Sequence, residues 1–389
     1  MSNTQYLKLV QPGCTWEELN MEFPFQGLLT LNHRPDFNSA VYLPFLKDGK
    51  TVDWDGLFKQ CAAVYDAGGV PVINADTGWA MFLGPKFKAM IARVVRKRFP
   101  GKRLVIALTI PWDPESEIDV NRLNEALDGV PADQDVRYMV MMNPKLVALR
   151  EQKLVDAYQQ IADILPQQFF AHELPEEFVP TLRELSPFEW LGVAKIDAVM
   201  GIKISSLKKP SFMRRTLLAR ELRSNGFNVK VMCGNDWGLV EALLYGEHFL
   251  IGAGSIFQNW YKRAFELYAD GDARAVAVFT ELQNIANIQF FSEDGQVGKY
   301  KDTTRVFLQR LRMIAHDSAL PEGLPDSDKR DSELNNMVVG IAMDRVKTVM
   351  EGLIGCEPVD FAAIDAVLNN GVSNDEATSD CDPSMPLQE

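Results

Sequence analysis

A lysine near the middle of the chain lies in a pattern that is typical of a reactive amine. The segment Ala198–Ser206 reads AVMGIKISS. Because side chains alternate along a strand, Met200 and every second residue after it are predicted to face outward, which turns Gly201, Lys203 and Ser205 inward. Burial favours the neutral form of an amine, and a neutral amine is what Schiff-base formation with a carbonyl requires. The same pattern also fits a buried lysine that only pairs with a carboxylate.

A short glycine-containing turn is the second candidate for chemistry. Asp76, Thr77 and Gly78 directly follow an apolar run. A tight turn of this kind exposes backbone N–H groups, which together with the Thr77 hydroxyl are predicted to hold the carboxylate of a 2-oxo acid beside Lys203. Asp76 would repel that carboxylate unless its side chain turns away. It is predicted either to act as a base or to stabilise the turn.

The elements that must position these residues repeat regularly. Short apolar runs alternate with longer segments of helical spacing, which indicates a parallel sheet. There are eight such runs, and eight favour a closed (β/α)8 TIM barrel over the alternative, a doubly wound open sheet. The runs are Ala40–Phe45, Val70–Asn74, Leu104–Thr109, Tyr138–Met142, Gln168–His172, Val199–Ile204, Val229–Cys233 and His248–Ala253.

The barrel is predicted to span residues 39–256, after an N-terminal extension at 1–38. Residues 257–353 form a predicted helical region, and the polar tail 354–389 is predicted to be largely disordered. The helices expected in the helical region are Tyr261–Tyr268, Ala273–Ile288, Thr304–Ala315 and Ser332–Leu353.

Composition excludes several classes of function. The 389 residues carry a formal net charge of −13 without a long basic run, which argues against nucleic acid or an anionic membrane as a partner. The chain lacks a run of about 18 apolar residues and an N-terminal signal pattern, so we expect a cytoplasmic protein that does not enter a membrane. The spacing of its cysteines and histidines predicts no metal site, and the glycine patterns predict no nucleotide cofactor.

Two stretches, Leu185–Pro187 and Gly201–Lys203, read Leu-Ser-Pro and Gly-Ile-Lys. They resemble a segment of the dihydrodipicolinate synthase / N-acetylneuraminate lyase family of class I aldolases, in which a helix leads into the strand that carries the Schiff-base lysine. Further stretches resemble the family in the same order, over roughly residues 40–352. They are Leu43–Leu57, Ala75–Gly78, Cys233–Asp236, His248–Ile251, Ala264–Ala275 and Pro321–Pro325.

The resemblance implies that Lys203 forms an imine with a 2-oxo acid such as pyruvate or a keto-deoxy sugar acid. It implies that the carbonyl of Ile251 shapes the pocket, and that Gly234 and Asn143, at the ends of the seventh and fourth strands, bind substrate. It also implies a homodimer or homotetramer.

The chain departs from the family where a tyrosine normally relays protons. The family's fifth strand ends Tyr-Asn-x-Pro, but residues 172–175 read His-Glu-Leu-Pro, and the tyrosine pair of the fourth strand is replaced by Met141 and Met142. His172 is predicted to take over the relay, since imidazole is a competent acid–base group near neutral pH, and a positively charged Lys203 would keep it neutral. A purely structural role for His172 fits the sequence equally well.

Two functions from different classes follow. The first is a Schiff-base lyase, an aldolase or dehydratase, that has diverged from dihydrodipicolinate synthase. The alternative is a non-catalytic or regulatory barrel that binds a small oxo acid.

Overall fold

A computed structural model of the chain describes residues 34–345, apart from 175, 178, 207–208, 253, 291–298 and 325–330. Eight parallel strands form a closed barrel in chain order, so the predicted (β/α)8 fold is confirmed. Most of the predicted N-terminal extension and the whole of the tail 354–389 lie outside the described residues. The strands are β1 Phe37–Ala40, β2 Val70–Ile73, β3 Leu104–Thr109, β4 Val136–Met141, β5 Phe169–Glu173, β6 Val199–Ile204, β7 Lys230–Cys233 and β8 His248–Ile251.

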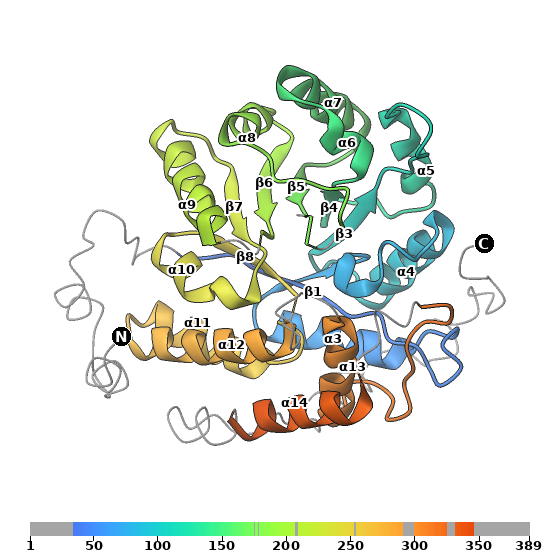
Figure 1. Ribbon diagram of the computed structural model, residues 1–389, viewed down its shortest axis with the longest axis vertical. Coiled ribbons are helices and arrows are strands. Elements are labelled where there is room, and N and C mark those ends of the chain that lie inside the picture. Colours follow the sequence, from blue (N-terminus) through green and yellow to red (C-terminus); the bar gives the residue numbers. More distant parts are fainter. Residues whose placement is uncertain are drawn as a thin grey trace.

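Helices surround the strands, and the last four gather along one side of the barrel (Figure 1). Those between strands are α3 Trp54–Asp66, α4 Pro85–Arg98, α5 Leu123–Leu127, α6 Pro144–Ala148, α7 Glu151–Ile164, α8 Pro187–Ala194, α9 Lys209–Ser224 and α10 Leu239–Leu244. Those after the last strand are α11 Gln258–Ala269, α12 Arg274–Phe290, α13 Tyr300–Arg310 and α14 Ser332–Arg345. Within the described residues there are also three short 3₁₀ turns: η1 Asp76–Gly78, η2 Val120–Arg122 and η3 Asp236–Gly238.

Two separate hydrophobic clusters reflect the alternation along the strands. The larger one joins the outward side chains of the strands to the helices. The smaller one draws only on strands and on the segment after β2, and it fills the barrel lumen with side chains such as Val72, Ala107, Phe170 and Leu250. The lumen is therefore a packed core, and in this fold active sites lie at the carboxyl ends of the strands.

The first strand lies earlier than its apolar run predicted. It spans Phe37–Ala40, whereas Ala40–Phe45 was the expected strand. Residues 41–45 are nevertheless buried, and Phe45 forms isolated bridges to Val52 and to Ala319, which follows α13. Burial in a loop here produces the same apolar run as burial in a strand.

The alternation predicted for β6 holds for Lys203 but is wrong for Met200. The pairing of β5 with β6 shifts register between Phe169 and Phe170, which leaves Met200 as the extra residue of a bulge in β6. Met200 consequently packs against the lumen cluster, although it was expected to face the helices. After the bulge, Ile202 and Ile204 join the outer cluster as predicted.

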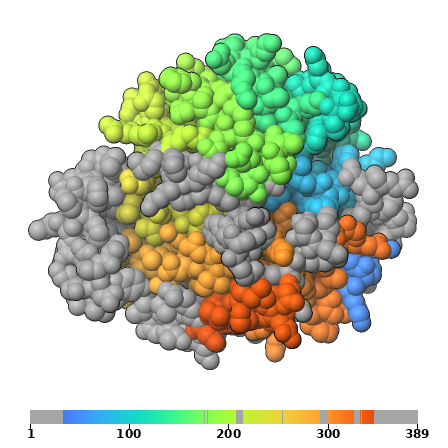
Figure 2. Space-filling view, viewed as in Figure 1, coloured from blue at the N-terminus to red at the C-terminus, as the bar shows by residue number. Residues whose placement is uncertain are grey.

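The C-terminal helices pack against each other and against the barrel. Helix α12 contacts α11, α10, α13 and α14, as well as the turn η3 that follows β7. In the space-filling view α14 lies on the surface, beside the orange residues of the preceding helices (Figure 2). Within the described ranges, no helix combines the length and apolarity needed to cross a membrane.

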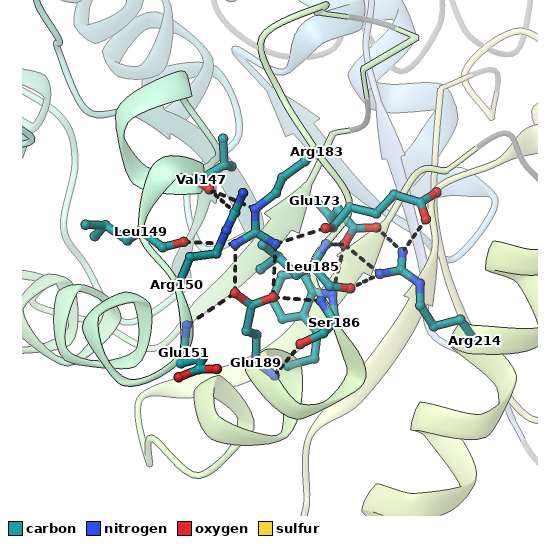
Figure 3. A network of polar contacts seen from close by, with 12 residues as sticks. Val147, Leu149, Arg150, Glu151, Glu173, Arg183, Leu185, Ser186, Glu189 and Arg214 are labelled. Atoms are coloured by element: carbon teal, nitrogen blue, oxygen red, sulfur yellow. Dashed lines mark hydrogen bonds and ion pairs between the residues drawn. The ribbon is translucent and has the colours of Figure 1, made fainter.

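A network of buried ion pairs holds the loops that leave β4 and β5 (Figure 3). Glu173, the last residue of β5, is fully buried and accepts from Arg214 at 2.5 Å, from the Leu185 N–H and from the Trp190 indole. Arg183 forms a second pair with Glu189 at 2.7 Å and donates to the carbonyls of residues 147 and 149. The network therefore fixes the carboxyl end of β5, immediately after His172.

Replacing Arg183 by alanine is expected to lower the free energy of unfolding by roughly 3 kcal/mol, because it leaves a buried carboxylate without its cation. Glu189 is only 5% exposed. The measurement is the urea denaturation midpoint. The matched control is Arg122→Ala, which breaks an exposed pair with Glu125 and should leave the midpoint unchanged. Equal midpoints for both variants would contradict a stabilising role for the network.

Candidate active site

Lys203 lies on the lumen side of β6, at the carboxyl end of the barrel. It lines a small cavity together with His172 from β5, the turn η1, Asp236 after β7, and Phe290 and Tyr300 from the C-terminal helices. The cavity has a volume of roughly 30 Å³, which is room for a few water molecules at most. A bound substrate must therefore displace some of the lining side chains.

The environment of Lys203 favours a neutral amine. The side chain is only 7% exposed, and burial lowers the pKa of the amine to about 8, although the charges of Asp236, Asp76 and Cys233 act in the opposite direction. Gly234 makes room for it: a Cβ there would lie 2.8 Å from Lys203 Cε and closer still to the Ser205 hydroxyl. A neutral lysine in a confined site is a suitable nucleophile for a carbonyl.

His172 is the partner of Lys203 on the neighbouring strand β5. The two residues are opposed across β5 and β6, and His172 Nε2 lies 3.1 Å from the Ser205 hydroxyl. Within the described part of the chain, its buried Nδ1 has no hydrogen-bond partner. Burial, and secondly the charge of Lys203, hold the pKa of His172 well below its ordinary value, so the ring is neutral at physiological pH.

The carboxylate of Asp76 is engaged by two residues of α13. It accepts from the Tyr300 hydroxyl at 2.7 Å and from the Lys301 amine at 3.0 Å. Burial raises the pKa of this carboxyl, but Lys301, the hydrogen bonds and Lys203 outweigh burial and lower it overall. Asp76 is thus ionised and neutralised by a cation, which removes the repulsion toward a substrate carboxylate that its sequence position implied.

The turn η1 presents backbone donors next to this ion pair. Among the described residues, the N–H groups of Asp76 and Thr77 donate to no backbone carbonyl, whereas that of Gly78 closes the turn on Ala75. Thr77 lines the cavity with its side chain. The turn is therefore able to receive an anionic group from the cavity side.

The remaining predicted residues lie at different distances from the cavity. Gly234 lines it, and so does Gly252, the residue after Ile251. Asn143 does not line it: its side chain caps α6 by accepting from the Leu146 N–H and donates to the carbonyl of residue 110. The position of Asn143 thus favours a structural role.

Sequence reasoning assigned no role to several cavity residues. Asp236 ends the stretch Cys233–Asp236, which resembles the family, and its carboxylate accepts from the Gly252 N–H at 2.8 Å. Ser205 was expected to face inward but was not connected with His172. Tyr300 and Lys301 had no local signal, because the helix containing them was predicted to begin at Thr304. Among the described residues, no cluster of three His, Cys, Asp or Glu side chains is arranged to hold a metal ion.

Comparison with known proteins finds no matching family model and no matching curated protein. Solved structures do match. Dihydrodipicolinate synthase from Oceanobacillus iheyensis is 17% identical with a TM-score of 0.64, over 81% of this chain and 97% of that one. YagE, a prophage protein of E. coli K12 from the dihydrodipicolinic acid synthase family, was solved with pyruvate and is 16% identical with a TM-score of 0.63, over 80% and 98%.

The chloride-inhibited dihydrodipicolinate synthase of Acinetobacter baumannii, also complexed with pyruvate, is 16% identical with a TM-score of 0.62, over 81% of this chain and 100% of that one. These likenesses span nearly the full length of each solved chain. The resemblance predicted from the motifs is confirmed at the level of the fold: this chain has the fold of the dihydrodipicolinate synthases.

Proposed function

We propose that the chain is a Schiff-base-forming lyase, an aldolase or a dehydratase, that acts on a 2-oxo acid such as pyruvate or a keto-deoxy sugar acid. The observation that carries the proposal is the position of Lys203, a buried amine in a confined cavity at the carboxyl end of the barrel. Attack of this amine on the C2 carbonyl yields an imine. Once protonated, the imine accepts electrons from a neighbouring C–C or C–H bond as it breaks.

The turn η1 is the proposed site for the substrate carboxylate. The N–H groups of Asp76 and Thr77, which donate to no backbone carbonyl among the described residues, supply the hydrogen bonds, and the Lys301–Asp76 pair leaves no net negative charge at the turn. Two of the similar solved structures contain pyruvate, which supports a small 2-oxo acid as the ligand class.

His172 is the proposed proton carrier for the step at carbon that follows imine formation. It lines the same cavity as Lys203, it is neutral, and its Nδ1 has no partner among the described residues. A neutral imidazole is able to take a proton from the carbon next to the imine and to return it.

The experiment is reductive trapping. The protein is incubated with pyruvate and with a series of longer 2-oxo acids, sodium borohydride is added, and the intact mass is measured. A mass increase equal to the reduced adduct, mapped to the peptide that contains Lys203, is the expected result. Binding of a 2-oxo acid without a trapped adduct would favour a barrel that only binds its ligand.

Adduct formation is expected to depend on pH through Lys203. Its ammonium form must lose a proton before it attacks, so at a fixed low concentration of 2-oxo acid the initial rate should rise with pH and reach half its maximum near pH 8. An ordinary exposed lysine would place this midpoint near 10.4. The rate is followed by quenching with borohydride at successive times. A midpoint above pH 10 would contradict a buried nucleophile.

A further inference from the structure

Resting on the proposed function, we infer that Tyr300 is the residue that carries protons between Lys203 and the substrate oxygen while the imine forms. Tyr300 is the first residue of α13, outside the barrel strands, and it lines the same cavity as Lys203. The phenol therefore borders the space that a carbonyl compound has to enter when it attaches to Lys203.

The Tyr300 phenol is held in one position by several contacts. Its hydroxyl donates to Asp76 at 2.7 Å and also lies within hydrogen-bonding distance of the Thr77 side chain. Its ring stacks on Phe290 with centroids 4.7 Å apart and an interplanar angle of 17°. A phenol that is hydrogen-bonded to a carboxylate and lines the same cavity as a reactive amine is a suitable proton relay.

Lys301 holds the carboxylate end of this relay. Its amine lies 3.0 Å from Asp76 and 5.2 Å from the centroid of the Trp79 ring, which is buried beside η1. Trp79 has a left-handed backbone conformation (φ 64°), which is strained for a bulky residue and is retained where its surroundings enforce it. Asp76 and Lys301 therefore act as positioning residues for the phenol.

The protons balance without an external acid or base. The Lys203 ammonium first loses a proton to the phenol oxygen as the phenol proton passes to Asp76. The free amine then attacks C2, which forms the C–N bond, and one N–H proton moves through Tyr300 to the substrate oxygen. Finally Asp76 returns its proton through Tyr300 to the hydroxyl, which leaves as water. An ammonium and a carbonyl have become a protonated imine and water.

His172 is less suited to this step. Its low pKa makes it a poor acceptor for the ammonium proton, and its Nε2 contacts Ser205. The pKa of Asp76 is also lowered, but its carboxylate accepts the phenol hydrogen bond directly at 2.7 Å, and the proton that it takes up is returned within the same reaction. The relay and His172 thus serve different steps.

The test is Tyr300→Phe, which removes the hydroxyl and keeps the ring stacked on Phe290. The probe is pyruvate, or whichever 2-oxo acid the unchanged protein traps best. The initial rate of adduct formation, read by borohydride quenching and intact mass, is expected to fall about 10²–10⁴-fold. The amount of adduct at equilibrium should stay close to that of the unchanged protein, because a relay alters the rate and not the equilibrium. A structural defect would lower both.

The matched control is Tyr158→Phe, which removes a buried hydroxyl from α7, where the ring stacks on Phe169. Its adduct rate should not change. If Tyr300→Phe does not fold, Asp76→Asn is the second variant; it keeps the size of the side chain but does not store the proton, and a rate loss of about 10²-fold is expected. If the folded Tyr300→Phe protein forms the adduct at an unchanged rate, the relay is wrong but the proposed function stands. The same conclusion follows from an unchanged rate in Asp76→Asn, where that is the variant tested. No adduct in the unchanged protein overturns the proposed function, and the relay with it.

Discussion

Replacing Lys203 by arginine is expected to abolish reductive trapping with every 2-oxo acid while the circular dichroism spectrum stays that of the unchanged protein. Arginine keeps a positive charge but remains protonated even when buried, so it offers no neutral nitrogen for attack on a carbonyl. The measurement is the intact mass after borohydride treatment, followed by peptide mapping. Because the loss is that of the reacting atom itself, no adduct should be detected at any pH.

Lys88 provides the matched control for this experiment. It is a second lysine whose pKa burial lowers to about 8, but it lies on α4, where its amine donates to the Ala80 carbonyl. The Lys88→Arg protein should form the adduct as the unchanged protein does. If a reduced adduct still forms in Lys203→Arg but is absent in Lys88→Arg, the reacting amine is Lys88, and our proposal is wrong.

Replacing His172 by alanine is expected to produce a different defect. Adduct formation should proceed at nearly the normal rate, whereas exchange of the C3 protons of pyruvate with deuterated solvent should slow about 10²–10⁴-fold. Exchange reports proton transfer at the carbon next to the imine, and NMR measures it without knowledge of the second substrate. The control is His316→Ala, at an exposed position outside the cavity.

His172→Ala and Tyr300→Phe together separate the two steps. The first should retain adduct formation and lose exchange, and the second should lose rapid adduct formation. Rapid exchange in His172→Ala would show that another group moves the proton at carbon. Asp236 would then be the next residue to replace, since it also lines the cavity.

The barrel and the position of Lys203 were predictable because both follow from local periodicity. Strand β6 was predicted with its observed bounds, and the alternation from Gly201 to Ser205 correctly turned Lys203 inward. The glycine turn after β2 was equally visible. In both cases the residues that determine the local structure are neighbours in the sequence, so a pattern of a few residues is enough to predict it.

The contacts that α13 makes with the site were not predictable, because they join residues far apart in the sequence. Tyr300 and Lys301 are separated from Asp76 by 224 and 225 residues, and only the packing of α13 brings them together. The first strand was misplaced because residues 41–45 are as buried as a strand would be. Asn143 matched a family position, yet a helix N-cap favours asparagine for its own reasons.

The bulge at Met200 determines how strand β6 tolerates changes of length. There β6 contains one residue more than regular pairing with β5 would need, and this surplus residue packs against the lumen core. Removing that residue would restore regular pairing and leave Lys203 on the same side. Removing a residue between the bulge and Lys203 would instead invert the phase of the strand and turn the amine toward the helices. We therefore expect the position of Lys203 to survive deletion of the bulge residue and to be lost when a residue between the bulge and Lys203 is deleted.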